Sequence, residues 1–437
     1  MEKIGKIELF TVALGSVIGW GAFMLPGSFF LQNAGVLNTI IGFLIAIVMI
    51  AIIEKNYSVL MDKHQSTGGE YTFAKEEFGN TVGFCTGWVL LLAYVSIIPL
   101  NATAIPMVFE KVFSFYSKGL LLYTIADFPV YLNDLLVSLL FIGVFSFIQL
   151  RGLNVSSKMQ NIVVAILLIC VMGLFFTTFI VANPVHQQNF ESNFGSFDIG
   201  SVIRIIAFAP WAFIGFDTVA QISSESRVSA KSASLMALIA VIFGGFVYNA
   251  INIVTAYGIA NTSLMTDAWA TGDAVLNLMG PIALVVVGMA MFGAVLSGLN
   301  GFFMSSTRLT SAMVPSKIKG LIDFKAIIIF ISFVSMIVPF FGRNALFWFV
   351  DISSVGASFA YLVVSLAALK LSVTLSQKLF GLLGSLCSVL FLIFLLTPFF
   401  GSNIPLVSAV VLAIWCMLGA LVYKVFYSEE VKVQDAF

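Results

Sequence analysis

The sequence contains little charge. Only 10% of its 437 residues are Asp, Glu, Lys or Arg, and basic and acidic residues balance at 21 each. Soluble domains carry about 25% charged residues, so this is not the composition of a chain whose surface meets mainly water. The balance of signs leaves no electrostatic basis for binding nucleic acid, and we expect no nucleic-acid partner.

Histidine and cysteine are also scarce. The two histidines, His64 and His186, lie far apart in polar segments, without the spacing of a metal site or a catalytic triad. The four cysteines fall in apolar stretches without paired spacing, which argues against structural disulfides. A GxxxxGK[ST] phosphate-binding loop is missing, so ATP-driven work would need a partner protein. We expect no enzymatic activity, no cofactor and no bound metal.

Long apolar runs dominate the chain, which is 60% hydrophobic with a mean hydropathy of +1.06. A helix needs about 20 apolar residues to cross the hydrocarbon core, and about twelve runs approach or exceed that length. A β-barrel would instead show short segments of alternating apolar and polar residues, which do not appear. The sequence therefore predicts an all-α integral membrane protein with the lipid bilayer around it. The predicted spans are residues 8–30, 36–60, 82–112, 131–150, 159–181, 201–222, 235–259, 279–306, 324–341, 346–370, 379–399 and 404–427.

Basic residues are distributed unevenly over the segments that connect these spans. If twelve spans place both termini on one face, 17 of the 21 Lys and Arg residues lie on that face and 4 on the other. Short connections rich in Lys and Arg remain in the cytoplasm. We therefore expect cytoplasmic N- and C-termini in a protein of the cell (inner) membrane.

Two predicted spans, the first and the sixth, contain residues that interrupt a helix. Gly15–Gly21 holds three glycines and is followed by Pro26, and Ala207–Gly215 contains Pro210 with Gly215 five residues later. Unwound backbone at membrane depth is tolerated only inside protein or beside a water-filled cavity. The pair of breaks therefore predicts a central site where peptide N–H and C=O groups bind a solute. Two other interpretations remain open: the first segment contains a GxxxG pair typical of helix packing, and a lone proline can produce a simple kink.

Four segments carry a further pattern. They are Gly15–Pro26, which reads GSVIGWGAFMLP; Gly68–Trp88, with GGEYTF followed by FG, GF and GW; Phe213–Asp217 with Glu225; and, more weakly, Ser157–Asn161. Together they resemble the amino acid, polyamine and organocation (APC) superfamily of secondary transporters. The resemblance covers most of the chain and implies a LeuT-like fold, with a 5+5 inverted repeat and two C-terminal helices. The implied units are residues 1–182, 183–371 and 372–437.

The same resemblance implies where a solute binds. A substrate carboxylate would meet the backbone N–H groups of Trp20 and Gly21, and an ammonium would meet the carbonyls of Val17, Trp211 and Ile214. Trp211 also stands at the position of an aromatic gate. The full set of expected substrate-binding residues is Ser16, Val17, Ile18, Gly19, Trp20, Gly21, Phe208, Trp211, Ile214 and Phe302.

The chain departs from the family pattern at several positions. Trp20 replaces a small residue that often contributes a hydroxyl, and Leu167 stands where many proton-coupled members have a lysine. Of the helix-eight hydroxyls that sodium-coupled relatives use, only Ser297 aligns, beside Gly298. The chain therefore lacks the lysine associated with proton coupling in many members, and the resemblance does not support coupling to sodium. Coupling to sodium stays an alternative because three further hydroxyl residues lie nearby: Ser305, Ser306 and Thr307.

Ionisable residues inside predicted spans are candidates for function. We expect Asp217, seven residues beyond Pro210, to handle a coupling proton together with the gate residue Trp211, although a structural cap is the alternative. We favour a structural hydrogen bond for Asp351. Arg204 is expected to reach the headgroups or guard the outer vestibule, and Glu54 to pair with Lys55 or a nearby loop cation.

The leading hypothesis is a secondary active transporter for amino acids or related small zwitterions, with alternating access and with H+ coupling or exchange. The expected pocket has no cluster of acids, which disfavours polyamines, but its aromatic rings keep an organic amine as an alternative substrate. A channel or a non-transporting sensor is the alternative from another class; the spans lack a polar pore lining and the chain lacks a soluble signalling domain. The solute, the coupling ion and the oligomeric state, monomer or homodimer, stay open.

Overall fold

The computed structural model describes residues 3–64, 67–125, 128–261, 269–398 and 401–427. Within these ranges, twelve helices are long and apolar enough to cross a membrane, and each overlaps one of the spans predicted from the sequence. The prediction of an all-α integral membrane protein is therefore confirmed.

Eight spans are single helices and four are built from shorter pieces. The single helices are α3 (Gly35–Lys63), α7 (Leu132–Leu150), α8 (Leu153–Val181), α12 (Ala230–Gly258), α14 (Pro281–Met313), α17 (Gly342–Leu371), α18 (Leu375–Leu396) and α19 (Leu406–Phe426). The divided spans are α1 (Lys6–Val17), α2 (Gly21–Leu25) and the π-helical η1 (Pro26–Leu31); α5 (Asn80–Ala102) and α6 (Ile105–Val112); α10 (Ile199–Phe213), α11 (Thr218–Ile222) and η2 (Ser223–Glu225); and α16 (Phe324–Ile337) and η4 (Val338–Phe341).

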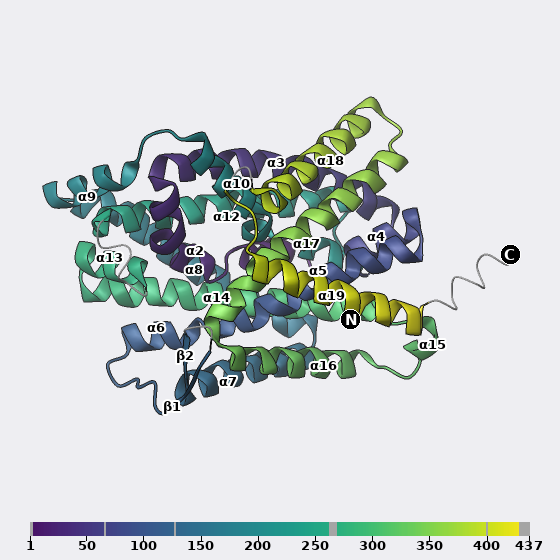
Figure 1. Cartoon of the computed structure of the whole chain (residues 1–437), viewed down its shortest axis with the longest axis horizontal. Helices are drawn as coiled ribbons and strands as arrows, with labels where there is room; N and C mark the ends of the chain where they lie inside the picture. Colours follow the sequence, from purple (N-terminus) through teal and green to yellow (C-terminus); the bar gives the residue numbers. More distant parts are fainter. Residues whose placement is uncertain (1–2, 65–66, 126–127, 262–268, 399–400, 428–437) are drawn as a thin grey trace.

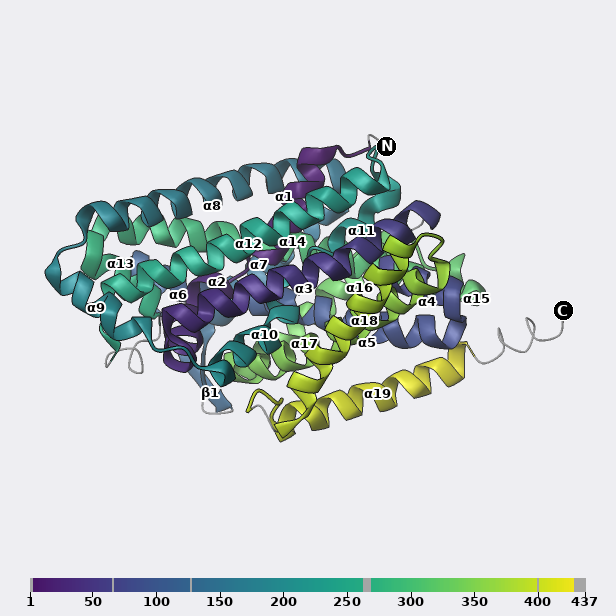
Figure 2. The ribbon, with the colours of Figure 1, turned by 90° about the horizontal axis from the view of Figure 1, so that it is seen from above.

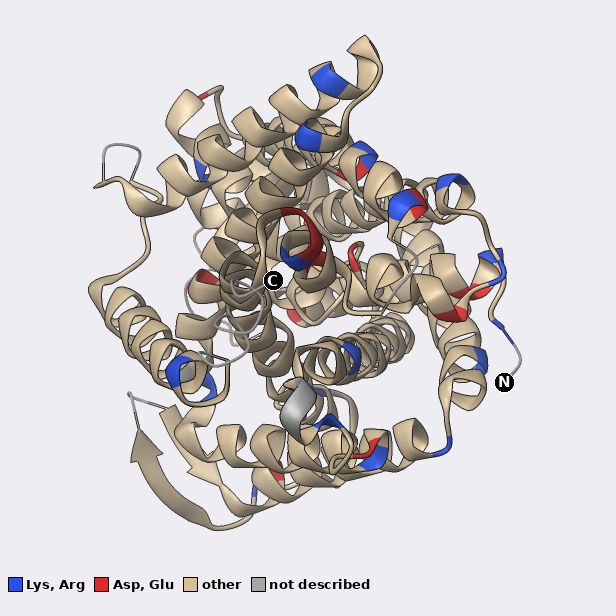
Figure 3. Ribbon diagram, turned by 90° about the vertical axis from the view of Figure 1, so that its right-hand side faces the viewer, with Lys and Arg blue, Asp and Glu red and all other residues tan. Residues whose placement is uncertain are grey.

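Short elements cover the two ends of the bundle (Figures 1 and 2). One end carries α4 (Gly69–Phe78) and α15 (Ser316–Lys319), and we call it the proximal face because the chain also starts there. The other end, the distal face, carries α9 (Pro184–Phe194), α13 (Ala270–Met279) and an antiparallel hairpin of β1 (Leu121–Ile125) and β2 (Phe128–Tyr131). Figure 3 looks onto the proximal face and shows Lys and Arg residues spread around its helix ends.

The first span lies in the interior and the last at the periphery. In its most apolar window, 89% of the residues of the first span are buried, and α1 packs against α12, α8 and α14. The corresponding fraction for α19 is 11%, with contacts to α17 and α5. A helix surrounded by protein needs small residues for close packing, which explains the glycines of the first span, whereas α19 presents apolar side chains that suit lipid.

Candidate solute-binding site

The first span is interrupted where its glycines cluster. Helix α1 ends at Val17, and Ile18 adopts an extended conformation before α2 begins at Gly21. The Trp20 N–H donates to the Asn101 side-chain oxygen at 3.2 Å. Within the described residues, the N–H groups of Gly19 and Gly21 have no hydrogen-bond acceptor. Of the two expected donors, the Gly21 N–H is therefore free for a ligand and the Trp20 N–H is engaged by Asn101, while the Gly19 N–H is an additional free donor.

The sixth span is interrupted as well, but not at its proline. Pro210 lies inside α10, and its carbonyl accepts a hydrogen bond from the Ile214 N–H at 3.1 Å. The helix ends at Phe213, and Gly215 has a φ of +117° before α11 begins at Thr218. The break predicted for Ala207–Gly215 is thus present at its glycine end and not at Pro210, because proline removes one hydrogen bond whereas a positive φ ends the helical path.

The two breaks touch each other. A Cβ placed on Gly215 would lie 2.5 Å from the Ser16 Cβ and 2.9 Å from the Val17 nitrogen. Gly15 approaches Gln160 and Ser297 of neighbouring helices just as closely. The helix-packing interpretation of the first glycine therefore holds, while Gly215 permits contact between the second break and the backbone at the end of α1, where the first break begins.

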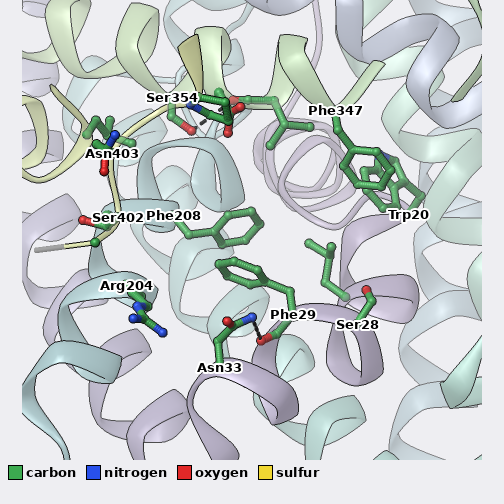
Figure 4. A pocket seen from close by; sticks show the side chains of 17 residues that line it. Trp20, Ser28, Phe29, Asn33, Arg204, Phe208, Phe347, Ser354, Ser402 and Asn403 are labelled. Carbon is green, nitrogen blue, oxygen red and sulfur yellow. Dashed lines mark hydrogen bonds between the residues drawn. The ribbon is translucent and has the colours of Figure 1, made fainter. Parts of the chain in front are cut away.

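A cavity of about 670 Å³ opens from this region toward the distal face. Figure 4 shows Phe29 and Phe208 at its centre, with their ring centroids 5.2 Å apart. Arg204 lies on one side of this cavity, and Trp20 and Phe347 lie together on the other (Figure 4). We call it the distal cavity. Aromatic walls with a few polar groups suit a small solute that has both an apolar and a polar part.

The structure brings some of the expected substrate-binding residues to this cavity and not others. Trp20 and Phe208 line it, and Trp211 packs against both, at ring-centroid distances of 5.6 and 5.0 Å. Phe302 instead faces Tyr94 at 5.8 Å. The Ser16 hydroxyl donates to the Val12 carbonyl inside its own helix. The others lie at or beside the breaks without lining the cavity; Gly19 is half-buried and the rest are buried, namely Val17, Ile18, Gly21 and Ile214.

On the proximal side of the breaks lie two buried carboxyl groups. Asp217 accepts hydrogen bonds from the Tyr94 hydroxyl and the Gly215 N–H, both at 2.8 Å. Glu70, in α4, accepts from the Tyr57 hydroxyl at 2.9 Å and from Gln221 at 2.7 Å. Burial, and then the charge of Asp217, raise the pKa of Glu70 well above its ordinary value. In the sequence, Glu70 stood out only as part of the GGEYTF motif. Nothing in the local sequence indicates that α4 places the Glu70 side chain inside the bundle.

The other ionisable residues differ in how well they match expectation. Arg204 lines the distal cavity, and Asp351 accepts from the Ser408 hydroxyl at 2.7 Å, as a structural role requires. Glu54 was expected to pair with Lys55 or a nearby cation, but within the described residues its carboxylate forms no ion pair. Neighbouring helical residues point in different directions, which explains why Lys55 does not reach it. Arg343, which sequence reasoning placed only in a distal connection, is 5% exposed beside Trp20.

The proximal end of the sixth span is closed by an ion pair. The Arg308 guanidinium donates from Nε and Nη2 to the two oxygens of Glu225, at 2.6 and 2.9 Å. The N-terminal segment covers the same place, because the Ile4 N–H donates to the Glu225 carbonyl and the Arg227 N–H donates to the Ile4 carbonyl. The site is thus open on the distal side and closed on the proximal side.

Two spanning helices that break beside each other, next to a cavity open to one face, are typical of secondary transporters. Comparison with known families agrees: the amino acid permease family matches residues 8–319, which is most of the chain. The chain belongs to this family, within the APC superfamily. It is a family of permeases and not of enzymes, as the sequence predicted.

Individual relatives are distant. The large neutral amino acids transporter small subunit 2 of Mus musculus is 24% identical over 317 residues, covering 70% of this chain and 57% of the relative. The branched-chain amino acid permease BcaP of Bacillus subtilis is 24% identical over 238 residues, covering 53% and 49%. The cationic amino acid transporter 4 of Mus musculus is 24% identical over 236 residues, covering 51% and 36%. The chain therefore aligns with only about a third to just over half of the length of these relatives.

Proposed function

We propose that this protein is a secondary active transporter for amino acids or closely related small zwitterions. The observation that carries the proposal is the contact between the two helix breaks, with free peptide groups near a cavity on the distal side. A central site that is open to one side at a time is what alternating access requires. The arrangement described above corresponds to the state open to the distal side.

A zwitterion suits the groups at the breaks. The free N–H groups of Gly19 and Gly21 attract a carboxylate, and the carbonyls of Val17 and Ile214 suit an ammonium group. The relatives are named for neutral, branched-chain and cationic amino acids, which supports the class of solute. A polyamine or organic amine is the weaker alternative, because the cationic Arg343 lies 4.5 Å from the ring of Trp20.

The proposal has three further parts. We propose that Asp217 couples transport to protons and that both termini lie in the cytoplasm. We also propose that residues 1–182 and 183–371 form an inverted repeat. Asp217 is buried at the break itself, so a change in its charge would act directly on the unwound segment. A transporter with this distribution of Lys and Arg would expose its distal cavity outside the cell. Exchange of one solute for another is the alternative to proton coupling.

Uptake of radiolabelled amino acids into proteoliposomes tests the central claim. Gly21→Leu places a side chain where a Cβ alone would lie 2.7 Å from the Trp211 ring, and we expect uptake to be lost. Gly173→Leu is the matched control, because a Cβ at Gly173 meets open space. Normal uptake by Gly21→Leu, or the absence of any transported amino acid in a broad screen, would remove the proposal.

Proton coupling is tested with Asp217→Asn. Asparagine can keep a hydrogen bond to the Gly215 N–H but cannot exchange a proton, so uptake should lose its dependence on external pH. If the pH profile of uptake stays that of the original protein, Asp217 is a structural cap and not the proton carrier.

A further inference from the structure

Arg204 Nε in the distal cavity is a buried hydrogen-bond donor without an acceptor, and on the opposite side of the cavity three further such donors lie together. They are Nε1 of Trp20, Nε1 of Trp211 and Nη2 of Arg343, each buried and each without a partner. Their side chains are neighbours: the Trp20 ring lies 5.6 Å from that of Trp211 and 4.5 Å from the Arg343 guanidinium carbon. A buried donor left unpaired is costly and a charged one more so, which makes a cluster of three unusual unless something binds there.

Arg343 carries the only charge of this cluster, and within the described residues no carboxylate pairs with it. Its Nη1 donates to the Leu100 carbonyl at 3.3 Å and to the Thr103 hydroxyl at 3.1 Å, which are both neutral acceptors. The remaining stabilisation comes from the face of Trp20. A buried guanidinium without a counter-charge is expensive, because neutral acceptors replace only part of its hydration.

Two described carboxylates share a cavity with members of this cluster, Asp134 with Arg343 and Asp351 with Trp20, and each accepts a hydrogen bond from a hydroxyl. Asp134 shares a small cavity with Arg343, but its Oδ1 accepts from the Tyr116 hydroxyl at 2.6 Å. Asp351, two turns further along α17, accepts from Ser408. Within the described residues neither carboxylate forms an ion pair with Arg343, so the carboxylate of a ligand can supply its counter-charge.

We propose that Arg343, together with the indole N–H groups of Trp20 and Trp211, binds a second carboxylate of the transported solute, which makes the preferred substrate an acidic amino acid. This inference rests on the proposed function. The α-carboxylate and ammonium of such a solute occupy the peptide groups of the two breaks, and its side-chain carboxylate meets the planar fork of the guanidinium. Arginine suits this role because its donors match both oxygens of a carboxylate.

Trp20 controls access to this subsite. Its ring lines the distal cavity and covers the guanidinium, which is not itself among the residues that line that cavity. A rotation of the Trp20 side chain would expose Arg343 to a solute in the cavity. A small residue in place of Trp20 would leave the guanidinium in contact with water.

The test compares two pairs of amino acids that differ only in the second carboxylate. Binding of glutamate against glutamine, and of aspartate against asparagine, is measured by thermal shift and by competition for uptake with the full-length purified protein at pH 7. We expect each acid to bind at least tenfold more tightly than its amide. Arg343→Gln should abolish this preference without weakening the binding of the amides.

Two further variants separate charge from geometry. Arg343→Lys keeps the charge but loses the fork, so an intermediate preference is expected. Lys118→Gln removes a distal charge that pairs with Glu110 outside the cavity, and it should leave the preference unchanged.

If the amides bind as tightly as the acids in the original protein, the inference is wrong although amino acid transport stands. If no amino acid binds or is transported, the proposed function itself fails. The comparison in the original protein needs no variant and decides the matter even if the Arg343 variants do not fold.

Discussion

Gly215 of the sixth span lies against Ser16 of the first, with only 2.5 Å between the position of a Gly215 Cβ and the Ser16 Cβ. This contact joins the two unwound segments into one packed unit. The positive φ of Gly215 turns the chain, and the missing side chain lets the turn rest on the backbone at Val17. Neither break can therefore change shape without moving the other, which is the coupling that a shared solute site needs.

Gly215→Ala should damage this unit severely. The methyl group would overlap Ser16, and alanine at this φ is strained, which together cost at least about 2 kcal/mol. We expect a lower melting temperature in detergent and loss of uptake. Gly173→Ala serves as the control, because it sits in helix α8 with open space around it and should be neutral or stabilising. Equal behaviour of the two variants would contradict the role given to Gly215.

Glu225→Gln should shift the protein away from its distal-open state. The variant removes the charge-assisted pair with Arg308, which is worth about 1.5–3 kcal/mol per hydrogen bond to a charged group. With the proximal side less firmly closed, Ser402→Cys in the distal cavity should react more slowly with a membrane-impermeant thiol reagent.

The labelling experiment needs a background in which Cys85 and Cys416 are replaced by serine, since both are exposed. Glu110→Gln is its control, because the Glu110–Lys118 pair is exposed and such pairs contribute little. Unchanged labelling of Ser402→Cys in the Glu225→Gln protein would show that this ion pair does not hold the proximal side closed.

Glu70→Gln should flatten the dependence of stability on pH. In the folded protein the pKa of Glu70 is raised, so its protonated form is favoured. The contribution of this group to stability is complete below the ordinary pKa of about 4.5 and is lost as pH rises through the raised value. Glutamine mimics the protonated form, and can still accept from Tyr57. Melting curves between pH 5 and about pH 9 measure the effect. Glu76→Gln, on the exposed side of the same helix, should follow the original protein.

Trp415→Phe should loosen the last span without preventing transport. The Trp88 indole donates to the Trp415 carbonyl and the Trp415 indole donates to the Trp88 carbonyl, each at 2.9 Å. Their rings stack at 4.4 Å, so phenylalanine removes one hydrogen bond, worth about 1 kcal/mol, but keeps an aromatic contact. A thermal melt should show a small loss of stability, and Cys416→Ser, on an exposed neighbouring position, should show none. A loss of uptake at full stability would mean that α19 takes part in transport.

The spans were the most predictable part of this protein. Every described span overlaps its prediction because lipid demands about 20 apolar residues per helix regardless of what packs against it. The interruption near Gly19 could also be predicted from the sequence, since three glycines in seven residues weaken any helix. The break in the sixth span lies at the end of the predicted segment Ala207–Gly215, because Gly215 turns the chain while Pro210 stays inside the helix.

The sequence by itself determined the class of the protein, the number of spans, the family and the two spans that break, because hydropathy and helix-breaking residues act locally. Only the tertiary structure decided which side chains surround the site. Glu70 reaches Gln221 across 151 positions of sequence, and Arg343 lies on Trp20 although more than 300 residues separate them. Burial and the pairing of charges depend on which helices become neighbours, and packing of the whole bundle sets that arrangement.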